Sequence, residues 1–215
     1  MKSPHIWVPL AAAALFSIGD FDEDTLDWAL RHHPLSSDRQ DAVDLSNDLK
    51  DLLRLNYLLT ALAVPSDSYS SRAKGLAGGL VAIELNRGIT TGLKSITDSK
   101  RPDIDENNSF PSLHASEASI AATLAVRNID YFEISKPAKI AWQVSSYTVA
   151  GVTAWARLEG NRHYPSDVLF GYALGHFLGA FFNDAFINPA YQENFRLGVS
   201  STREGDALLS VDLRW

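Results

Sequence analysis

The 215-residue sequence contains no cysteine, so a disulfide framework and thiol-based catalysis are both excluded. Long apolar runs are absent too: no hydrophobic stretch reaches about 18 residues, the length that suggests a membrane-spanning helix. Histidine and acidic residues do not cluster at the spacings typical of a metal site. With a mean hydropathy of −0.09, these features favour a soluble or peripheral helical protein over one that crosses a membrane several times.

Positive charge is in short supply: 19 Lys and Arg residues stand against 26 Asp and Glu residues, for a net charge of −7. This balance argues against nucleic acid as a partner. It also makes any basic pocket a local exception, suited to an anionic substrate. The length is that of one well-buried domain, and no segment resembles a long linker. We therefore expect a helical domain over residues 1–190, followed by an extension over residues 191–215.

Hydrophobic residues spaced three and four apart predict an all-α bundle. The segment from Asp41 to Val64 carries leucines at a spacing that predicts one buried stripe. The segment from Tyr69 to Thr97 carries five glycines, which permit close helix packing. In the apolar segment from Val168 to Phe182, glycines recur four residues apart, and His176 is expected to be a core residue. Further helices are expected at residues 22–33, 115–126 and 138–155.

The two ends of the chain differ from this pattern. Residues 1–19 combine one lysine with an apolar stretch interrupted by Pro9, which suggests a secretory signal peptide but is short for one. We expect a short packing helix there, with Met1 in place of a removed signal, and hence a periplasmic or envelope location. Alternating residues at 195–199 and 209–215 predict a β-hairpin packed on the helical domain. The alternative is an edge that pairs with another chain or approaches a membrane.

The segment from Arg157 to Asp167 places a guanidinium, an imidazole and a carboxylate within eleven residues. Pro165 suits the first position of a helix, so His163 should lie just outside the helix N-terminus, an end that attracts anions. Asp167 would then hold one ring nitrogen of His163 and leave the other free as a nucleophile. Arg157 offers a planar fork for phosphate. An ordinary helix start is the alternative interpretation.

Two clusters upstream favour the first interpretation. Lys94 and Arg101 are seven residues apart, which would place both on one face of a helix that Pro102 ends. Ser112 is a suitable N-cap for the helix that follows, with His114 in the first turn and the first amides free. Taken singly, each cluster also fits a plainer interpretation: a solvated basic face for the first and a simple helix cap for the second.

Together the three clusters resemble the three motifs of the type 2 phosphatidic acid phosphatase superfamily. That superfamily also contains class A bacterial acid phosphatases, glucose-6-phosphatase and vanadium haloperoxidases. The resemblance covers residues 94–167, about a third of the chain. Two positions depart from the family pattern: Leu113 stands where the family usually has glycine, and Ala156 where it usually has serine. Neither change affects a charged or proton-transferring position.

The resemblance implies a phosphate-binding cradle of cations, a hydroxyl and backbone amides, formed by Lys94, Arg101, Ser112, Leu113 and Arg157. It implies that His163 attacks phosphorus to form a phosphohistidine, that Asp167 fixes the tautomer of His163, and that His114 protonates the leaving group. Fixed cations in such a site stabilise the charge of the transferring phosphoryl group. The resemblance implies no metal ion and no cofactor, and it makes vanadate an expected inhibitor.

The expected function is therefore a metal-independent phosphatase that hydrolyses a phosphomonoester or a pyrophosphate. The residues around His163 resemble the lipid phosphatases of the superfamily more than its class A acid phosphatases. The expected partner is a lipid or a small phosphorylated molecule, with peripheral membrane contact and without nucleic acid. Two alternatives stay open. One is a haloperoxidase with vanadate as its cofactor, although those enzymes are much larger; the other is a non-catalytic phosphate-binding or envelope structural protein.

Overall fold

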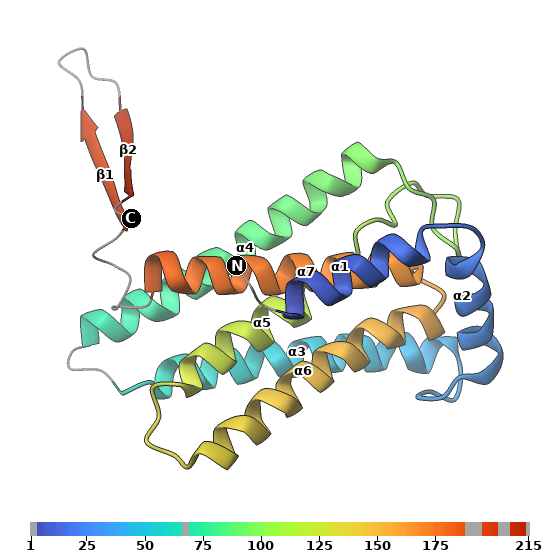
Figure 1. The fold of residues 1–215 in the computed structure, drawn as a ribbon, viewed down its shortest axis with the longest axis horizontal. Helices are drawn as coiled ribbons and strands as arrows, with labels where there is room; N and C mark the ends of the chain where they lie inside the picture. Colours follow the sequence, from blue (N-terminus) through green and yellow to red (C-terminus); the bar gives the residue numbers. More distant parts are fainter. Residues whose placement is uncertain (1–3, 66–68, 188–194, 202–206, 214–215) are drawn as a thin grey trace.

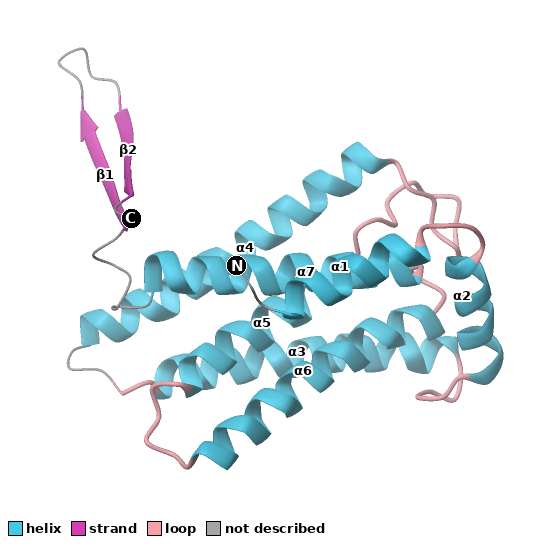
Figure 2. Cartoon of the chain, viewed as in Figure 1, coloured by secondary structure: helices cyan, strands magenta, loops and turns pink. Residues whose placement is uncertain are grey.

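The computed structural model describes residues 4–65, 69–187, 195–201 and 207–213. Most of them form helices that run side by side in a bundle (Figure 1), coloured cyan in Figure 2. The helices are α1 (Pro4–Phe16), α2 (Phe21–His32), α3 (Arg39–Ala63), α4 (Tyr69–Thr97), α5 (Leu113–Ile129), α6 (Lys136–Glu159) and α7 (Pro165–Phe182), followed by a short π-helix, η1 (Asn183–Ile187). The predicted all-α class is confirmed.

Local sequence signals explain where several helices begin. The carboxylate of Asp38 accepts a hydrogen bond from the amide of Asp41, 2.9 Å away, and caps α3. Ser112 caps α5 and Ser135 caps α6 in the same way. A short polar side chain at this position binds an amide that the helix start leaves free. Pro165 begins α7, as predicted.

Helix α5 is the centre of the bundle and packs against α3, α4, α6 and α7. Alanine and serine recur along it, and most of its residues are buried. Its contact with α7 depends on glycine. A Cβ atom at Gly171 would lie 2.4 Å from the carbonyl oxygen of Ser112, and one at Gly175 would lie 2.2 Å from that of Ser116. The two backbones therefore touch without side chains between them, as the glycine spacing predicted.

Two buried polar side chains connect helices inside the core. The hydroxyl of Tyr57 donates to the carbonyl oxygen of Leu76 at 2.9 Å. Its ring rests on Gly79, where a Cβ atom would lie 1.9 Å from the Tyr57 hydroxyl. His176 is 5% exposed, and its Nδ1 atom lies 2.9 Å from the Thr123 hydroxyl. The prediction of a core histidine is confirmed.

The predicted leucine stripe of α3 is largely not buried, and that prediction was wrong. The helix instead buries a face of mostly small side chains, because only such a face lets α3 approach α5 and α6 closely: Ala42, Ser46, Leu53, Tyr57, Thr60 and Ala61. Four leucines on α3 have exposed fractions of 50% to 57%: Leu52, Leu55, Leu59 and Leu62. Three of them line, together with Trp142 of α6, an apolar groove of about 580 Å³ between α3 and α6.

Helix α4 has the predicted bounds, Tyr69–Thr97, but it does not continue to Pro102 as the spacing of Lys94 and Arg101 suggested. It ends at Thr97, and Asp98 follows with a φ of 48°, a left-handed conformation that stops the helix before Pro102. Arg101 therefore lies in the loop between α4 and α5, and not on one helix face with Lys94. Three backbone hydrogen bonds hold this loop: Arg101 N to Glu106 O at 3.0 Å, Glu106 N to Ile104 O at 2.9 Å, and Ser109 N to Ser99 O at 2.9 Å.

Both ends of the chain carry the predicted elements. The expected short helix is α1, which packs on α7. At the other end, β1 (Phe195–Ser201) pairs antiparallel with β2 (Ala207–Leu213). The predicted domain boundary at residue 190 lies outside the described residues, and packing of the hairpin on the helices stays a prediction. Among the described helices, none alone has the length and apolar character to cross a membrane; α1 and α2 have it only as a pair, bent by 97°.

Candidate active site

The predicted site residues gather at one end of the bundle, where four helix ends meet. Lys94 lies in the last turn of α4 and Arg157 in the last turn of α6. His114 lies in the first turn of α5. His163 lies two residues before α7, and Asp167 lies in the first turn of α7. In Figure 1 this is the end that carries α2 and the loop between α4 and α5.

Two contacts bring the starts of α5 and α7 together. The amide of Ser112 donates to the carbonyl oxygen of Asp167 at 3.0 Å. One turn later, Gly171 lacks the side chain that would separate the helices at Ser112. As a result, His114 and His163 interact electrostatically although they are far apart in the sequence. The charge of His163 is among those that lower the pKa of His114.

Arg157 is a buried cation that forms no ion pair with the described residues. It is only 4% exposed, and its Nη1 atom donates to the hydroxyl of Ser46 at 2.9 Å. Its Nε atom has no hydrogen-bond partner, and no carboxylate of the described residues forms an ion pair with it. Burial, with the charges of Arg162 and Arg101, lowers its pKa to about 10. Because an unpaired buried charge is costly, Arg157 marks a site suited to an anion.

Lys94 and Arg101 add two cations to the same region. The Nζ atom of Lys94 donates to the carbonyl oxygens of Asn108 and Ser109, at 2.5 and 3.0 Å, so the loop holds this ammonium group without neutralising it. Burial and the charge of Arg101 lower the pKa of Lys94 to about 8. The Nε atom of Arg101 is buried and, like that of Arg157, has no hydrogen-bond partner within the described chain.

Backbone amides at the start of α5 are the last part of the predicted cradle. The hydroxyl of Ser112 accepts a hydrogen bond from the amide of Ala115 at 3.5 Å. The amides of Leu113 and His114 then have no partner inside the helix. Leu113 replaces the usual glycine without strain, because it is not among the residues with a positive φ.

His163 is 1% exposed. Both its ring and the hydroxyl of Ser109, a residue that the sequence did not indicate, contact the carboxylate of Asp167. Its Nδ1 atom lies 3.5 Å from Asp167 Oδ2 and 3.4 Å from Ser109 Oγ. The same Oδ2 atom accepts hydrogen bonds from Ser109 Oγ at 2.5 Å and from the amide of Tyr164 at 2.9 Å. Burial lowers the pKa of His163 to about 4, against the opposing effect of Asp167. The ring is therefore neutral near pH 7, with Nε2 as the nitrogen available to a substrate.

His114 has surroundings of the opposite character. Its Nε2 atom lies 2.9 Å from the side-chain oxygen of Asn47 on α3, and no carboxylate among the described residues forms an ion pair with it. Burial, followed by the charges of Arg157, Lys50 and His163, lowers the pKa of His114 to about 2. The ring is neutral unless a negative charge joins these cations.

Three residues that contact the predicted site were not found from the sequence. Each lies far along the chain from its partner: Ser109 by 58 residues, Asn47 by 67 and Ser46 by 111. Local spacing cannot reveal such pairs. A serine followed by an asparagine in the middle of a leucine-rich helix is nevertheless a usable signal, because both side chains are poor helix formers in that position.

Several acidic residues near the site hold neighbouring segments in place. Asp103, in the loop after α4, pairs with Arg162 at 2.7 Å, and Asp22 of α2 accepts hydrogen bonds from the amide and the hydroxyl of Ser166. In the part of the chain that the structure describes, no group of three or more His, Asp or Glu side chains is placed to hold a metal ion.

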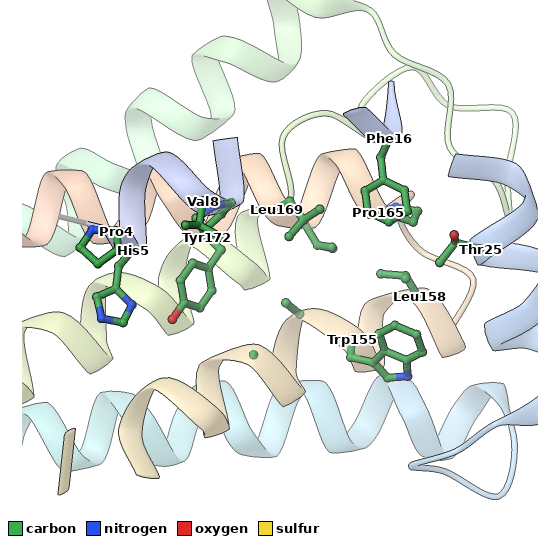
Figure 3. Close-up of a pocket in the computed structure, with 14 residues that line it drawn as sticks. Pro4, His5, Val8, Phe16, Thr25, Trp155, Leu158, Pro165, Leu169 and Tyr172 are labelled. Carbon is green, nitrogen blue, oxygen red and sulfur yellow. The ribbon is translucent and has the colours of Figure 1, made fainter. Parts of the chain in front are cut away.

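An apolar groove of about 560 Å³ lies between α1, α6 and α7 (Figure 3). None of the predicted site residues lines it. Two of its lining residues are close to site residues in the sequence, because Leu158 follows Arg157 and Pro165 lies two positions after His163. The groove therefore runs along α6 and α7 and reaches the end of these helices that carries the predicted site, but it is distinct from that site.

Comparisons with known proteins agree with this geometry. The family model of the PAP2 superfamily matches residues 76–188. Lipid A 1-phosphatase from Porphyromonas gingivalis is 33% identical over 127 residues, which are 57% of this chain and 27% of that protein. The match thus spans about a quarter of the relative's length.

A solved structure shares the fold. The transmembrane PAP2 type phosphatidylglycerolphosphate phosphatase from Bacillus subtilis matches with a TM-score of 0.66 and 18% identity, covering 85% of this chain and 95% of that one. The segment that the family model matches is more than half of the chain and contains every predicted site residue. The chain belongs to the PAP2 superfamily.

Proposed function

We propose that the protein is a metal-independent phosphatase that hydrolyses a phosphomonoester or a pyrophosphate. The observation that carries this proposal is the buried guanidinium of Arg157, which no described carboxylate pairs with and which lies near Lys94 and Arg101. A phosphoryl group in transfer spreads negative charge over its equatorial oxygens, so three fixed cations would stabilise its transition state. The names of the two relatives, both phosphatases, support the same assignment.

His163 is the proposed nucleophile. Its Nε2 atom attacks phosphorus in line as the leaving oxygen departs, which gives a phosphohistidine. Asp167 and Ser109 face Nδ1, so the hydrogen stays on Nδ1 and the lone pair on Nε2. The carboxylate also offsets the positive charge that the ring acquires when it bonds to phosphorus.

His114 is the proposed proton carrier. It gives a proton to the leaving oxygen in the first half of the reaction and takes one from the attacking water in the second half. Burial and the cations around it lower the pKa of His114 and keep the ring neutral when no phosphate is bound. A phosphate dianion bound among the same cations would offset their charge and favour the protonated ring.

A lipid phosphate at the cell envelope is the proposed substrate. By their names, the two relatives act on lipid A and on phosphatidylglycerolphosphate. Large apolar side chains are exposed on α3 and α6 and also on α1 and α4, including Trp7, Val8, Leu15, Val81, Leu85 and Ile89. Exposed apolar surface of this extent is typical of an interaction face, and it supports a membrane contact for this chain.

Hydrolysis of p-nitrophenyl phosphate and of a short-chain phosphatidic acid, in buffer with a metal chelator, tests the proposal. We expect turnover that vanadate inhibits and that His163→Ala lacks, while circular dichroism shows that the variant is folded. The ratio of the two rates tests the preference for lipid. Turnover that requires an added divalent ion would contradict the metal-independent mechanism. Vanadate binding without turnover would favour a binding protein, and halide oxidation with vanadate and peroxide would favour a haloperoxidase.

A further inference from the structure

Helix α3 lies outside the three motifs and outside the segment that the family model matches, which begins at residue 76. Two consecutive residues of α3 nevertheless contact the site. The hydroxyl of Ser46 accepts a hydrogen bond from Arg157 Nη1 at 2.9 Å, and Asn47 Oδ1 lies 2.9 Å from His114 Nε2. Helix α3 therefore contributes to the surroundings of both a proposed phosphate ligand and the proposed proton carrier.

The Ser46 contact has a fixed direction. The hydroxyl hydrogen points to the carbonyl oxygen of Val43, 2.7 Å away in the same helix. Only the oxygen lone pairs are then left for Arg157. Since Ser46 is fully buried, the α3 backbone sets the place of this acceptor and, through it, one edge of the guanidinium. The two hydrogen bonds of Ser46 fix the position of α3 relative to Arg157, so the neighbouring Asn47 is also held at a defined position.

The Asn47 contact decides which ring nitrogen of His114 carries the hydrogen. An amide oxygen can only accept, so its contact with Nε2 requires a hydrogen on Nε2. A neutral imidazole has one N–H group, and Nδ1 is then the nitrogen with a free lone pair. Any proton that the neutral ring takes up must therefore arrive at Nδ1.

The same hydrogen bond fits both halves of the proposed reaction. In the first, the His114 imidazolium transfers its Nδ1 proton to the leaving oxygen as the bond from that oxygen to phosphorus breaks, and the ring becomes the neutral Nε2–H form. In the second, Nδ1 takes a proton from the water whose oxygen bonds to phosphorus. The bond between phosphorus and His163 breaks, and its electron pair returns to the ring of His163. Throughout, the Asn47 oxygen can accept from the unchanged Nε2–H group.

We propose that Asn47 is a positioning residue for His114: it holds the ring in the Nε2–H form and directs proton exchange through Nδ1. This inference rests on the proposed phosphatase function. A neutral amide suits the task, because it orients the ring without adding a negative charge that would repel a phosphate. A carboxylate is suited to the position of Asp167, because it contacts Nδ1 of His163 and not Nε2, the nitrogen proposed to attack phosphorus.

Three variants test the proposal kinetically. Asn47→Leu removes the acceptor at similar size, and Asn47→Asp replaces it by a charged one. Asn56→Leu makes the same exchange further along α3, where the amide contacts Ser146, and serves as the matched control. The substrates are p-nitrophenyl phosphate, whose leaving group needs no proton, and phenyl phosphate, whose leaving group does.

We expect Asn47→Leu to lower kcat about 100-fold on phenyl phosphate and far less on p-nitrophenyl phosphate. Asn47→Asp should shift the descending limb of the kcat–pH profile to higher pH, because a carboxylate favours the imidazolium. Asn56→Leu should change neither quantity. Equal losses on both substrates, or a response to Asn47→Leu no different from that to Asn56→Leu, would overturn the proposal.

A measurement without turnover separates this proposal from the phosphatase function. Nitrogen NMR shifts of the His114 ring in the full chain distinguish the Nε2–H form from the Nδ1–H form. We expect Nε2–H in the wild type near neutral pH and a mixture of forms in Asn47→Leu. An Nδ1–H ring in the wild type overturns the proposal even if the enzyme is active. An Nε2–H ring that Asn47→Leu disturbs, in a protein that hydrolyses no phosphoester, supports the positioning role and counts against the phosphatase function.

Discussion

A histidine lies at the start of α7 and another at the start of α5, at the same end of the bundle, yet of the two only His163 has a carboxylate neighbour among the described residues. His163 has the carboxylate of Asp167 at 3.5 Å, which raises its pKa against the effects of burial and of the charges of Arg157 and Lys94. His114 has an amide and several cations, which act with burial to lower its pKa further. A nearby anion suits a nucleophile that becomes positive as it bonds to phosphorus, whereas nearby cations suit a ring that gains its proton together with a phosphate. The presence or absence of a neighbouring carboxylate, and not the residue type, thus distinguishes the two proposed roles.

Removal of the nucleophile should have the largest effect. In His163→Ala no ring nitrogen is left to bond to phosphorus, so we expect kcat to fall by at least about 10⁴-fold. The loss should be similar for p-nitrophenyl phosphate and phenyl phosphate, measured beside a circular dichroism spectrum that shows an intact fold. A residual rate that depends strongly on the leaving group would indicate that His163 is the acid and His114 the nucleophile.

Removal of the anion should bring His163 closer to the situation of His114. Asp167→Asn takes away the charge that raises the pKa of His163 and offsets the phosphohistidine, so we expect kcat to fall roughly 10³-fold. The matched control is Asp103→Asn, which removes a carboxylate that pairs with Arg162 in the neighbouring loop. If both variants lose the same activity, the effect of Asp167 is not specific to His163.

Removal of the proton carrier should give a loss that depends on the leaving group. We expect His114→Ala to lower kcat by about 10²-fold or more for phenyl phosphate and by much less for p-nitrophenyl phosphate. The measurement is kcat for a series of aryl phosphates, plotted against the pKa of the leaving phenol. A slope equal to that of the wild type would exclude the acid role of His114.

The pH dependence of stability should show the smallest effect and what the two histidines share. Burial lowers both folded-state pKa values below the ordinary 6.5, to about 2 for His114 and about 4 for His163, so protonation favours the unfolded chain. The stabilisation that depends on the neutral rings is complete above pH 6.5 and is lost as the pH falls, towards 4 for His163 and towards 2 for His114. We expect a loss of roughly 1–3 kcal/mol per histidine over that range. Urea unfolding of His114→Gln and His163→Gln should each show a flatter pH profile; an unchanged profile would contradict the burial of that ring.

The residues that combine a fixed chemical role with a local signal could be predicted from the sequence. Pro165 begins α7, and Ser112 caps α5, because each acts on the backbone within one helical turn. The structure also brings Arg101 and Lys94 to the site, but its support for Arg101 differs from the prediction. The left-handed conformation of Asp98 ends α4 before Pro102 can, so the arginine is held by a loop.

Features that depend on tertiary contacts could not be predicted in this way. Leucine spacing on α3 indicates a helix, but it does not say whether a leucine face or a small-residue face packs inward, and the small-residue face packs inward. Ser109 and Asn47 have no motif of their own; each matters only through a residue of another element. Their roles follow from the folded geometry, which single-sequence spacing does not contain.

The contact at Gly171 sets the spacing between the starts of α5 and α7. Because the α7 backbone there lies against the carbonyl of Ser112, the lack of a Cβ atom at Gly171 allows the starts of α5 and α7, which hold His114 and His163, to lie close together. A single added methyl group would push the two helices apart and increase the distance between His114 and His163, although no motif residue would be changed. A chain with alanine at this position would keep every motif residue in its sequence and yet hold its two histidines further apart than the proposed reaction requires.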